Sequence, residues 1–354
     1  MNPSEYHSFL IKVGIAACGV VDTSRPLTYD AYCSQIAKGI PQNLGYLQRN
    51  ASCREGFEAI MPGTKSVLCF GIAMPKMPTS APCHFARFCA IGDYHTVLRD
   101  RIGQVLHFLK DHFPIENSRI CVDTAPVLER ELAIRAGFGS IGYNHMIIHP
   151  QWGSYISLGE LLVDVDLMPY RETLAFNTSP LFDPKNLIPG AVGCCPKHCR
   201  QCVRACPTGA LSSNGYDVNR CLAYWTIQHR GIIPKEFAKA MGNVIWGCDR
   251  CQQGCPRIRD NDIPAPEDNP LSRITLKEIL TLSGRQLRIR VAQTVIADVH
   301  PYMLQRNACI VIANTGKREF IPDLENVAQN HACEWVRSTA QSSLNILTNG
   351  FVRI

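Results

Sequence analysis

The sequence predicts an α/β region, followed by an iron–sulfur segment and a helical C-terminal tail. Three observations predict this order. Short apolar runs alternate with helical patterns over residues 1–180, nine of the eighteen cysteines lie between Cys194 and Cys255, and amphipathic stretches follow residue 270. A chain of 354 residues is long enough for two or three domains with separate cores. We therefore expect domains at 1–180, 181–265 and 266–354.

The first region contains two predicted strands and two predicted helices. Residues 66–74 (SVLCFGIAM) and 118–123 (SRICVD) are short apolar runs typical of buried strands. Residues 96–113 place apolar side chains at 98, 102, 105, 106, 109 and 113, which is the spacing of one helix face. Residues 126–137 predict a second helix, with Pro126 in its first turn and Gly137 at its end. This alternation predicts an α/β (α+β) fold.

The cysteine-rich segment is expected between two turn-rich linkers, 177–193 and 263–270. Beyond the second linker, residues 287–299, 303–316 and 335–347 have amphipathic helical patterns. The stretches RNACIVIA and VRSTAQSSL recur about thirty residues apart, which indicates a degenerate helical repeat. The tail should be helical, with too few copies to form an independent solenoid.

Composition restricts the class of protein. With 46% apolar and 19% charged residues the chain reads as globular, and no run of about 18 apolar residues could cross a membrane. The start, MNPSEYHSFLIKVGIAACGVV, lacks the basic region and cleavage site of a signal peptide. We expect a cytoplasmic protein, in which thiols stay reduced. The net charge of +6 permits a polyanionic partner without establishing one.

The cysteines in the middle of the chain form two blocks with the same spacing, C-x2-C-x3-C-P. The first contains Cys199, Cys202 and Cys206, and the second contains Cys248, Cys251 and Cys255. Two such blocks are typical of bacterial iron–sulfur ligation, in which the cysteine before proline reaches the other cluster. Zinc is the alternative, because C-x2-C pairs also build zinc sites. The paired x3-C-P extension favours clusters. The nine scattered cysteines are interpreted as small buried apolar residues.

Two four-iron clusters need eight thiolates, so two further ligands are required. Cys221 is one natural choice, and the other is Cys195 or Cys194. A ferredoxin run would have cysteine at position 196, where this chain has Pro196. We choose Cys195 over Cys194, while both remain open. The crossed pattern then assigns Cys195, Cys199, Cys202 and Cys255 to one cluster, and Cys206, Cys221, Cys248 and Cys251 to the other.

Two further features have competing interpretations. The stretch GFGSIG (137–142) matches a dinucleotide fingerprint, but it follows a predicted helix and precedes a strand-like MIIH, so turn glycines are favoured. Asp123 ends a strand and precedes a helix. It could be an N-cap of that helix or a catalytic group, because strand ends also carry active sites in α/β folds.

Seven stretches in order along the chain resemble one family, the epoxyqueuosine reductases, which are corrinoid iron–sulfur enzymes acting on tRNA. They are GDYH (92–95), VDTAPVLERELAIRAGFGSIGYN (122–144), GSYISLGELLVDV (153–165), ACPTGAL (205–211), RCLAYWTIQHRGIIP (220–234), GNVIWGCDRCQQGCP (242–256) and QRNACIVIANTG (305–316). The resemblance implies a cobalamin-binding α/β domain, a ferredoxin-like domain with two [4Fe-4S] clusters and a HEAT-like helical tail. It also implies the last step of queuosine synthesis, a two-electron reduction of an epoxide on the wobble nucleoside.

The resemblance also implies site residues and partners. Asp123, in the VDT element, would be the proton donor, and its pKa would have to be raised by burial for it to donate at neutral pH. The cofactor would be cob(II)alamin, with contacts from Arg54, Ala86, Asp123, Ile147 and Leu158. The partners would be an external electron donor and the anticodon stem-loop of a tRNA with a GUN anticodon (the tRNAs for Asp, Asn, His and Tyr), bound by a monomer. Basic tail residues would grip the RNA: Arg285, Arg288, Arg290, Arg306, Lys317, Arg318 and Arg337.

The chain departs from the family pattern in three places. Its first cysteine motif is irregular, IGYN stands where GKN is common, and CPRI stands where CPWN is usual. Two other functions remain open at this point. One is a small-molecule corrinoid reductase of the dehalogenase type, and the other is an electron-transfer or corrinoid-activating protein without a substrate of its own.

Overall fold

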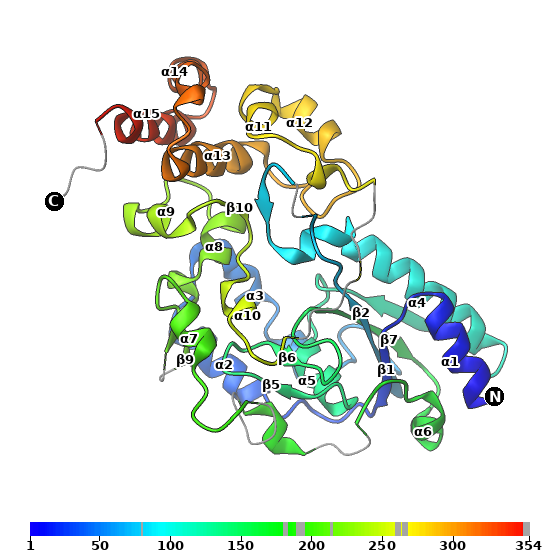
Figure 1. Ribbon diagram of the computed structural model, residues 1–354. Coiled ribbons are helices and arrows are strands. Elements are labelled where there is room, and N and C mark those ends of the chain that lie inside the picture. Colours follow the sequence, from blue (N-terminus) through cyan, green and yellow to red (C-terminus); the bar gives the residue numbers. More distant parts are fainter. Residues whose placement is uncertain are drawn as a thin grey trace.

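The structure is a computed structural model that describes residues 1–78, 81–179, 183–188, 195–212, 215–258, 263 and 268–349. Figure 1 shows a sheet with flanking helices at the N-terminal side, the cysteine-rich segment next to it, and a group of helices at the top that ends the chain. The predicted linkers 177–193 and 263–270 lie only partly within the described residues. No helix in the described ranges is both long and apolar enough to cross a membrane.

The central sheet has four strands in the order β1-β2-β7-β4. They are β1 (Ala17–Val21), β2 (Ser66–Ala73), β7 (Ile156–Val163) and β4 (Ser118–Cys121). The strands predicted at 66–74 and 118–123 are confirmed. Every neighbouring pair in the sheet is antiparallel. The rule about the ends of parallel strands, which left a catalytic role for Asp123 open, therefore does not apply here.

Helices cover the two faces of this sheet and position the site at its end. On one face, α1 (Pro3–Lys12) and α4 (Tyr94–Lys110) bury Leu10, Leu98 and Ile102 against the strands. The periodicity at 96–113 thus predicted α4 within a few residues. Asp93 caps the start of α4, since its side chain accepts from the backbone N–H of His95. On the other face lies α5 (Glu129–Arg135). The short α6 (Arg171–Leu174) packs beside β1 and α1, with Leu174 in the core of the first face.

The helix α5 is shorter than the predicted 126–137, and the difference matters for the site. Residues 123–128 form a tight loop instead of a first helical turn, with Asp123 at φ +51°. The helix begins after Leu128, which offers no side-chain cap. Asp123 is therefore not an N-cap, and this alternative is wrong.

The stretch GFGSIG leads into a small hairpin of β5 (Ser140–Ile141) and β6 (Ile147–Ile148). A dinucleotide fingerprint would lead into a helix, so the interpretation of these residues as turn glycines is confirmed. Gly139 has φ +124°, and a Cβ there would lie 2.2 Å from the carbonyl oxygen of Ile148. Only glycine fits this close approach.

The remaining elements connect the sheet region to the cysteine-rich segment. Helices α2 (Tyr29–Ala37) and α3 (Gly45–Arg49) follow β1, and β3 (His84–Phe85) pairs in parallel with β10 (Val244–Trp246). The cysteine-rich segment itself contains α7 (Gln201–Ala205), β8 (Leu211–Ser212), β9 (Gly215–Tyr216), α8 (Leu222–Ile227), α9 (Lys235–Met241) and α10 (Arg250–Gln253).

The tail is helical, as predicted, and packs on β10 through one apolar core. It comprises α11 (Leu276–Thr281), α12 (Gly284–Arg290), α13 (Pro301–Thr315), α14 (Ile321–Asn330) and α15 (Glu334–Asn349). The predicted stretch 287–299 is helical only as far as Arg290, whereas 303–316 and 335–347 are confirmed. Sequence patterns missed α11 and α14. The helix α13 is not amphipathic, because it is buried on nearly every side between α15 and the cysteine-rich segment.

Candidate functional site

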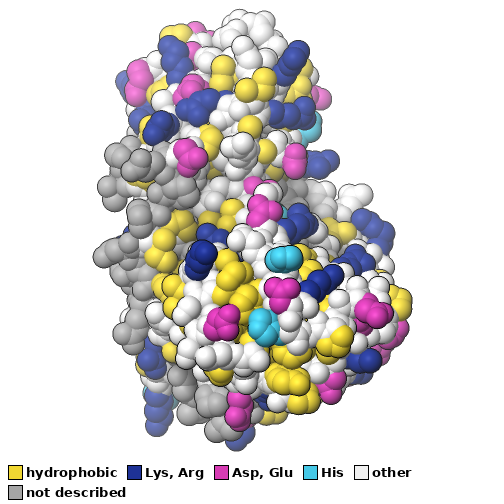
Figure 2. Space-filling view, turned by 90° about the vertical axis from the view of Figure 1, so that its right-hand side faces the viewer, with side chains coloured by type: hydrophobic (Ala, Val, Ile, Leu, Met, Phe, Trp, Pro, Cys, Tyr) yellow, Lys and Arg dark blue, Asp and Glu magenta, His cyan; other side chains and the backbone are white. Residues whose placement is uncertain are grey.

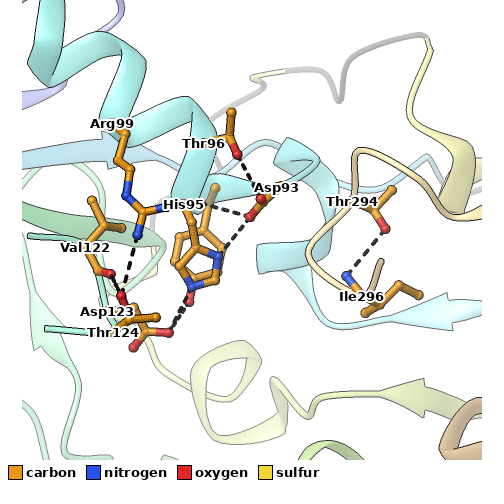
Figure 3. Close-up of polar contacts among 10 residues, drawn as sticks. Asp93, His95, Thr96, Arg99, Val122, Asp123, Thr124, Thr294 and Ile296 are labelled. Atoms are coloured by element: carbon orange, nitrogen blue, oxygen red, sulfur yellow. Dashed lines mark hydrogen bonds and ion pairs between the residues drawn. The ribbon is translucent and has the colours of Figure 1, made fainter. Parts of the chain in front are cut away.

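The carboxylate of Asp123 is held from one side by two aromatic residues of α4. Tyr94 Oη donates to Asp123 Oδ2 at 2.6 Å, and His95 Nε2 lies 3.2 Å from the same oxygen. The Tyr94 and His95 rings stack with their centroids 4.1 Å apart. The Asp123 side chain still keeps 56% of its surface exposed, so a ligand can reach it from the open side. Figure 3 shows the contact of His95 with Asp123, between the end of β4 and the first turn of α4.

The imidazole of His95 bridges two carboxylates. Its Nδ1 lies 2.8 Å from Asp93 Oδ1, while its Nε2 faces Asp123. The contact with Asp123, and then that with Asp93, raises the pKa of His95 above its ordinary value. The ring therefore tends to carry a proton at both nitrogens. Asp93 is fixed in turn by Thr96, whose hydroxyl donates to its other oxygen at 2.9 Å.

Asp123 does not have the raised pKa that we expected for a proton donor. The hydrogen bond from His95 lowers its pKa, burial acts in the opposite direction, and the hydrogen bond from Tyr94 lowers it further. The directions of the two pKa shifts favour an ionised Asp123 beside a protonated His95.

Two further carboxyl groups lie behind Asp123. Glu129 Oε1 accepts from the backbone N–H of Asp123 at 2.8 Å, and burial and the negative charge of Asp123 raise the pKa of Glu129 to about 7. Glu160, on β7 opposite Cys69 and Cys121, is fully buried, and burial raises its pKa well above the usual value. Neither of its oxygens has a hydrogen-bond partner among the described residues. The raised pKa values favour the neutral form of these two carboxyls, whereas the lowered pKa of Asp123 favours its charged form.

The four cysteines assigned to the first cluster come together. Cys195, Cys199, Cys202 and Cys255 line one small pocket, although they are up to sixty residues apart in sequence. The other wall of the pocket is the turn between β5 and β6, including Gly142 and Asn144. The helices α7 and α10 approach closely at Gly254, where a Cβ would lie 2.7 Å from the Cβ of Ala205. Cys194, the alternative first ligand, lies outside the described residues.

The four cysteines assigned to the second cluster also lie near one another. Burial raises the pKa of Cys251, and the neighbouring Cys248, Cys221 and Cys206 raise it further. Burial likewise raises the pKa of Cys248 to about 11. Burial would raise the pKa of Cys206 too, but backbone N–H groups of Thr208, Leu211 and Ala210 lower it. Cys248 and Cys251 would thus ionise readily only when a cation binds them.

The geometry of the cysteine sets bears on the choice between clusters and zinc. Within the ranges that the structure describes, no three His, Cys, Asp or Glu side chains are close enough to hold a single metal ion. The spacing of the two C-x2-C-x3-C-P blocks is what favours four-iron clusters over zinc.

The five expected corrinoid contacts occupy different surroundings. Leu158 and Ile147 belong to the same apolar core on one face of the sheet. Arg54 and Asp123 both act on the pKa of Tyr46, so these three lie near one another. Ala86 is buried, and its backbone N–H donates to the carbonyl oxygen of Trp246. Asp123 and Leu158 keep exposed surface for a cofactor, whereas Ala86 and Ile147 are buried.

Comparison with known proteins agrees with this arrangement. Residues 194–257 match the family described as "4Fe-4S double cluster binding domain", and residues 54–124 match "Epoxyqueuosine reductase QueG, DUF1730". The epoxyqueuosine reductase of Bacillus cereus is 32% identical over 313 residues, which is 85% of this chain and 77% of that protein. The chain belongs to the epoxyqueuosine reductase family. The Escherichia coli epoxyqueuosine reductase is 29% identical over 86% of this chain and 79% of its own length.

Solved epoxyqueuosine reductase structures share the whole fold. One, in complex with an epoxyqueuosine-modified stem loop of tRNA-Tyr, has a TM-score of 0.80 at 26% identity and covers 97% of this chain and 89% of that one. The Streptococcus thermophilus enzyme has a TM-score of 0.80 at 25% identity, over 98% and 90% of the two chains. This chain is thus a mixed α/β oxidoreductase with a double [4Fe-4S] cluster binding domain.

Membership of the epoxyqueuosine reductase family draws attention to residues that sequence patterns missed. Asp93, Tyr94 and His95 entered only as the motif GDYH, with no role assigned to any of them. The sequence feature that could have indicated them is an aspartate at the N-cap of a helix, followed by a tyrosine and a histidine in its first turn. Two basic residues expected to contact RNA are engaged inside the protein instead. Arg306 is fully buried, and Arg290 pairs with Glu278 at 2.7 Å.

Proposed function

We propose that this chain reduces epoxyqueuosine to queuosine at the wobble position of tRNA, the last step of queuosine biosynthesis. The observation that carries the proposal is the contact of Asp123 with Tyr94 and His95, within a chain of this family that also brings two sets of four cysteines together. Removal of the epoxide oxygen as water consumes two electrons and two protons. The cysteine sets account for the electrons and the Asp123 site for a proton.

We assign Cys195, Cys199, Cys202 and Cys255 to one [4Fe-4S] cluster and Cys206, Cys221, Cys248 and Cys251 to the other. Clusters, when bound, transfer single electrons from an external donor. Cobalamin, when bound, would supply a strongly nucleophilic reduced cobalt that no side chain can match. The residues that would hold it are Asp123 and Leu158 with their side chains, the backbone near Ala86 and Ile147, and Arg54 beside Tyr46.

Asp123 is the proposed proton donor, and His95 is its proton source. The opened epoxide leaves an oxygen that must be protonated by a group within hydrogen-bond reach. A ligand that covers the exposed side of Asp123 removes water from it, which raises its pKa. His95 Nε2, which would supply the proton, lies 3.2 Å from Asp123 Oδ2, and Asp93 on the far side holds the ring in place. Tyr94 keeps the carboxylate oriented.

The proposed domains are a cobalamin-binding domain at 1–180, a ferredoxin-like domain at 181–265 and a HEAT-like tail at 266–354. The tRNA partner would carry a GUN anticodon, and the enzyme would act as a monomer. The proposed RNA-contacting surface includes exposed Arg288 of α12 and exposed Arg230 of the cysteine-rich segment. Both lower the pKa of His300, after the effect of burial, so they lie on the same part of the molecule. Figure 2 shows Lys and Arg side chains on the upper lobe, interspersed with acidic ones.

The test is an anaerobic assay of the reconstituted protein. Iron, sulfide and cobalt are measured, and an epoxyqueuosine-containing anticodon stem-loop is incubated with a reductant and analysed by mass spectrometry. We expect loss of one oxygen from the modified nucleoside, which depends on added cobalamin. A protein that carries zinc and no sulfide, or that leaves the stem-loop unchanged when fully loaded, would contradict the proposal.

A further inference from the structure

Asn144 presents a buried hydrogen-bond donor with no partner in the protein. The residue is 6% exposed, and its side-chain Nδ2 has no hydrogen-bond partner among the described residues. Its Oδ1 accepts from the backbone N–H of Met146 at 3.2 Å. This bond fixes the orientation of the amide, because the reverse orientation would place two donors against each other. A buried N–H without an acceptor is costly, so an acceptor is expected where it points.

The turn that carries Asn144 is built to hold that side chain in place. Gly142 N–H bonds to the carbonyl of Met146 at 2.9 Å, and His145 N–H bonds back to the carbonyl of Gly142 at 2.9 Å. A Cβ at Gly142 would lie 2.7 Å from Asn144 Oδ1, so glycine makes room for the amide. The neighbouring Tyr143 ring is covered by the guanidinium of Arg200, 3.5 Å from the ring centroid. The turn is therefore clamped against the segment that contains Cys199.

Asn144 lines the same pocket as the four cysteines of the first set, Cys195, Cys199, Cys202 and Cys255. The β5–β6 turn forms one wall of the pocket and contributes the Asn144 amide, whose Nδ2 has no partner among the described residues, and the thiols form the opposite wall. Thiolates and the inorganic sulfides of a cluster are hydrogen-bond acceptors, and they become stronger acceptors when the cluster gains an electron. The unused donor and the four thiols thus fit one bound group.

We propose that Asn144 donates its Nδ2–H to a sulfur of the cluster held by this first cysteine set and raises the reduction potential of that cluster. The inference rests on the cluster assignment made under the proposed function. The hydrogen bond favours the reduced, more negative state, so its loss lowers the potential. Asn144 is a positioning and tuning residue, and it belongs to the hairpin of the sheet region. It is the point at which that region would set the potential of a cluster in the neighbouring segment.

The experiment is an EPR-monitored redox titration of fully loaded Asn144→Asp and Asn144→Leu proteins. Asn144→Leu removes both polar atoms at similar size without adding a charge and is the deciding variant. Asn144→Asp keeps the acceptor for Met146 and removes the donor, but it also adds a negative charge that lowers the potential by itself. We expect one cluster to become about tenfold harder to reduce, which is about 59 mV for a one-electron couple. The cluster on the other four cysteines should titrate as in the wild type. Asn326→Asp is the matched control, because Asn326 Oδ1 also accepts one hydrogen bond but lies exposed on α14.

Wild-type potentials for both clusters in fully loaded variants would overturn the proposal. If a variant loses iron, the hydrogen bond is tested in the wild-type protein instead. With asparagine carrying ¹⁵N in its side-chain amide, pulsed EPR of the reduced protein should detect a coupled ¹⁵N nucleus, and its absence would refute the hydrogen bond. Iron and sulfide content, together with turnover, distinguish a failure of this inference from a failure of the proposed function. A shifted potential without epoxyqueuosine reduction would overturn the proposed function and leave this inference standing.

Discussion

His95 and Asp123 share a short polar contact, with Nε2 and Oδ2 3.2 Å apart, although 27 residues separate them in the chain. The contact joins the start of α4 to the loop after β4. It holds the pKa of Asp123 below, and that of His95 above, their ordinary values. The pair thus places a carboxylate beside an imidazole that can supply a proton to it.

Asp123→Asn should lower turnover by roughly 10²–10⁴-fold, because the amide cannot deliver a proton. Folding should survive, since asparagine tolerates the left-handed backbone at φ +51° and can still accept from Tyr94. The measurement is single-turnover reduction of the modified stem-loop, with cobalamin content determined in parallel. Asp100→Asn, on the exposed side of α4, is the control. Undiminished turnover in a loaded Asp123→Asn protein would remove the proposed role.

His95→Gln should destabilise the protein more at about pH 5 than at about pH 9. The folded pKa of His95 is raised, so its contribution is fully present below its unfolded pKa of about 6.5 and is lost as pH rises through the folded value. The folded pKa of Asp123 is lowered, so its contribution is present above about 3.9 and is lost as pH falls through the folded value. The pair is therefore most stabilising between these limits. Urea unfolding of wild type and variant at several pH values checks the difference, and equal losses at all pH values would argue against the pair.

Cys199→Ser and Cys251→Ser should each remove about half of the roughly eight iron atoms bound per chain, because each destroys one cluster of four. The same loss is expected from Cys195→Ser. Iron and sulfide analysis after anaerobic reconstitution gives the result. Cys309→Ser, in the buried core of the tail, is a control that should keep all the iron. A Cys195→Ser protein with full iron would transfer the ligand role to Cys194.

Replacing Arg230 and Arg288 together by Gln should raise KM for the stem-loop more than it lowers kcat. Their phosphate contacts would release counterions, so wild-type binding should weaken steeply with salt and the variant less so. A Lys12→Gln, Lys110→Gln protein serves as the control, since these exposed residues lie at the ends of α1 and α4. Equal activity on the free nucleoside and the stem-loop, without salt dependence, would favour a small-molecule reductase.

The sequence was most informative where function depends on local spacing. The two C-x2-C-x3-C-P blocks each place three ligands within eight residues, so their pattern is readable before the chain folds. Apolar periodicity likewise predicted α4, because burial of one helix face leaves a regular pattern, and a continuous apolar run predicted β2, which is buried on both faces.

The sequence was least informative where a residue depends on a distant partner. No pattern indicates that His95 faces Asp123, because the contact depends on where β4 ends relative to α4. Periodicity also could not show that the sheet is antiparallel. Arg306 read as an exposed cation in a helical pattern, yet the structure buries it, because backbone carbonyls supplied by another segment surround its guanidinium.

Those carbonyls have a consequence for the stability of the whole molecule. Arg306 Nη1 donates to His229 and Gly231, and Nη2 donates to Trp225, at 2.7–2.9 Å. A guanidinium without access to water cannot give up these acceptors unless α13 and the loop at 225–231 separate together. The helical tail from α13 onward therefore cannot be removed without loss to the rest of the protein. A chain cut before α13 would leave three backbone carbonyls without a donor next to the cluster ligands, so the tail and the metal centre should melt as one cooperative unit.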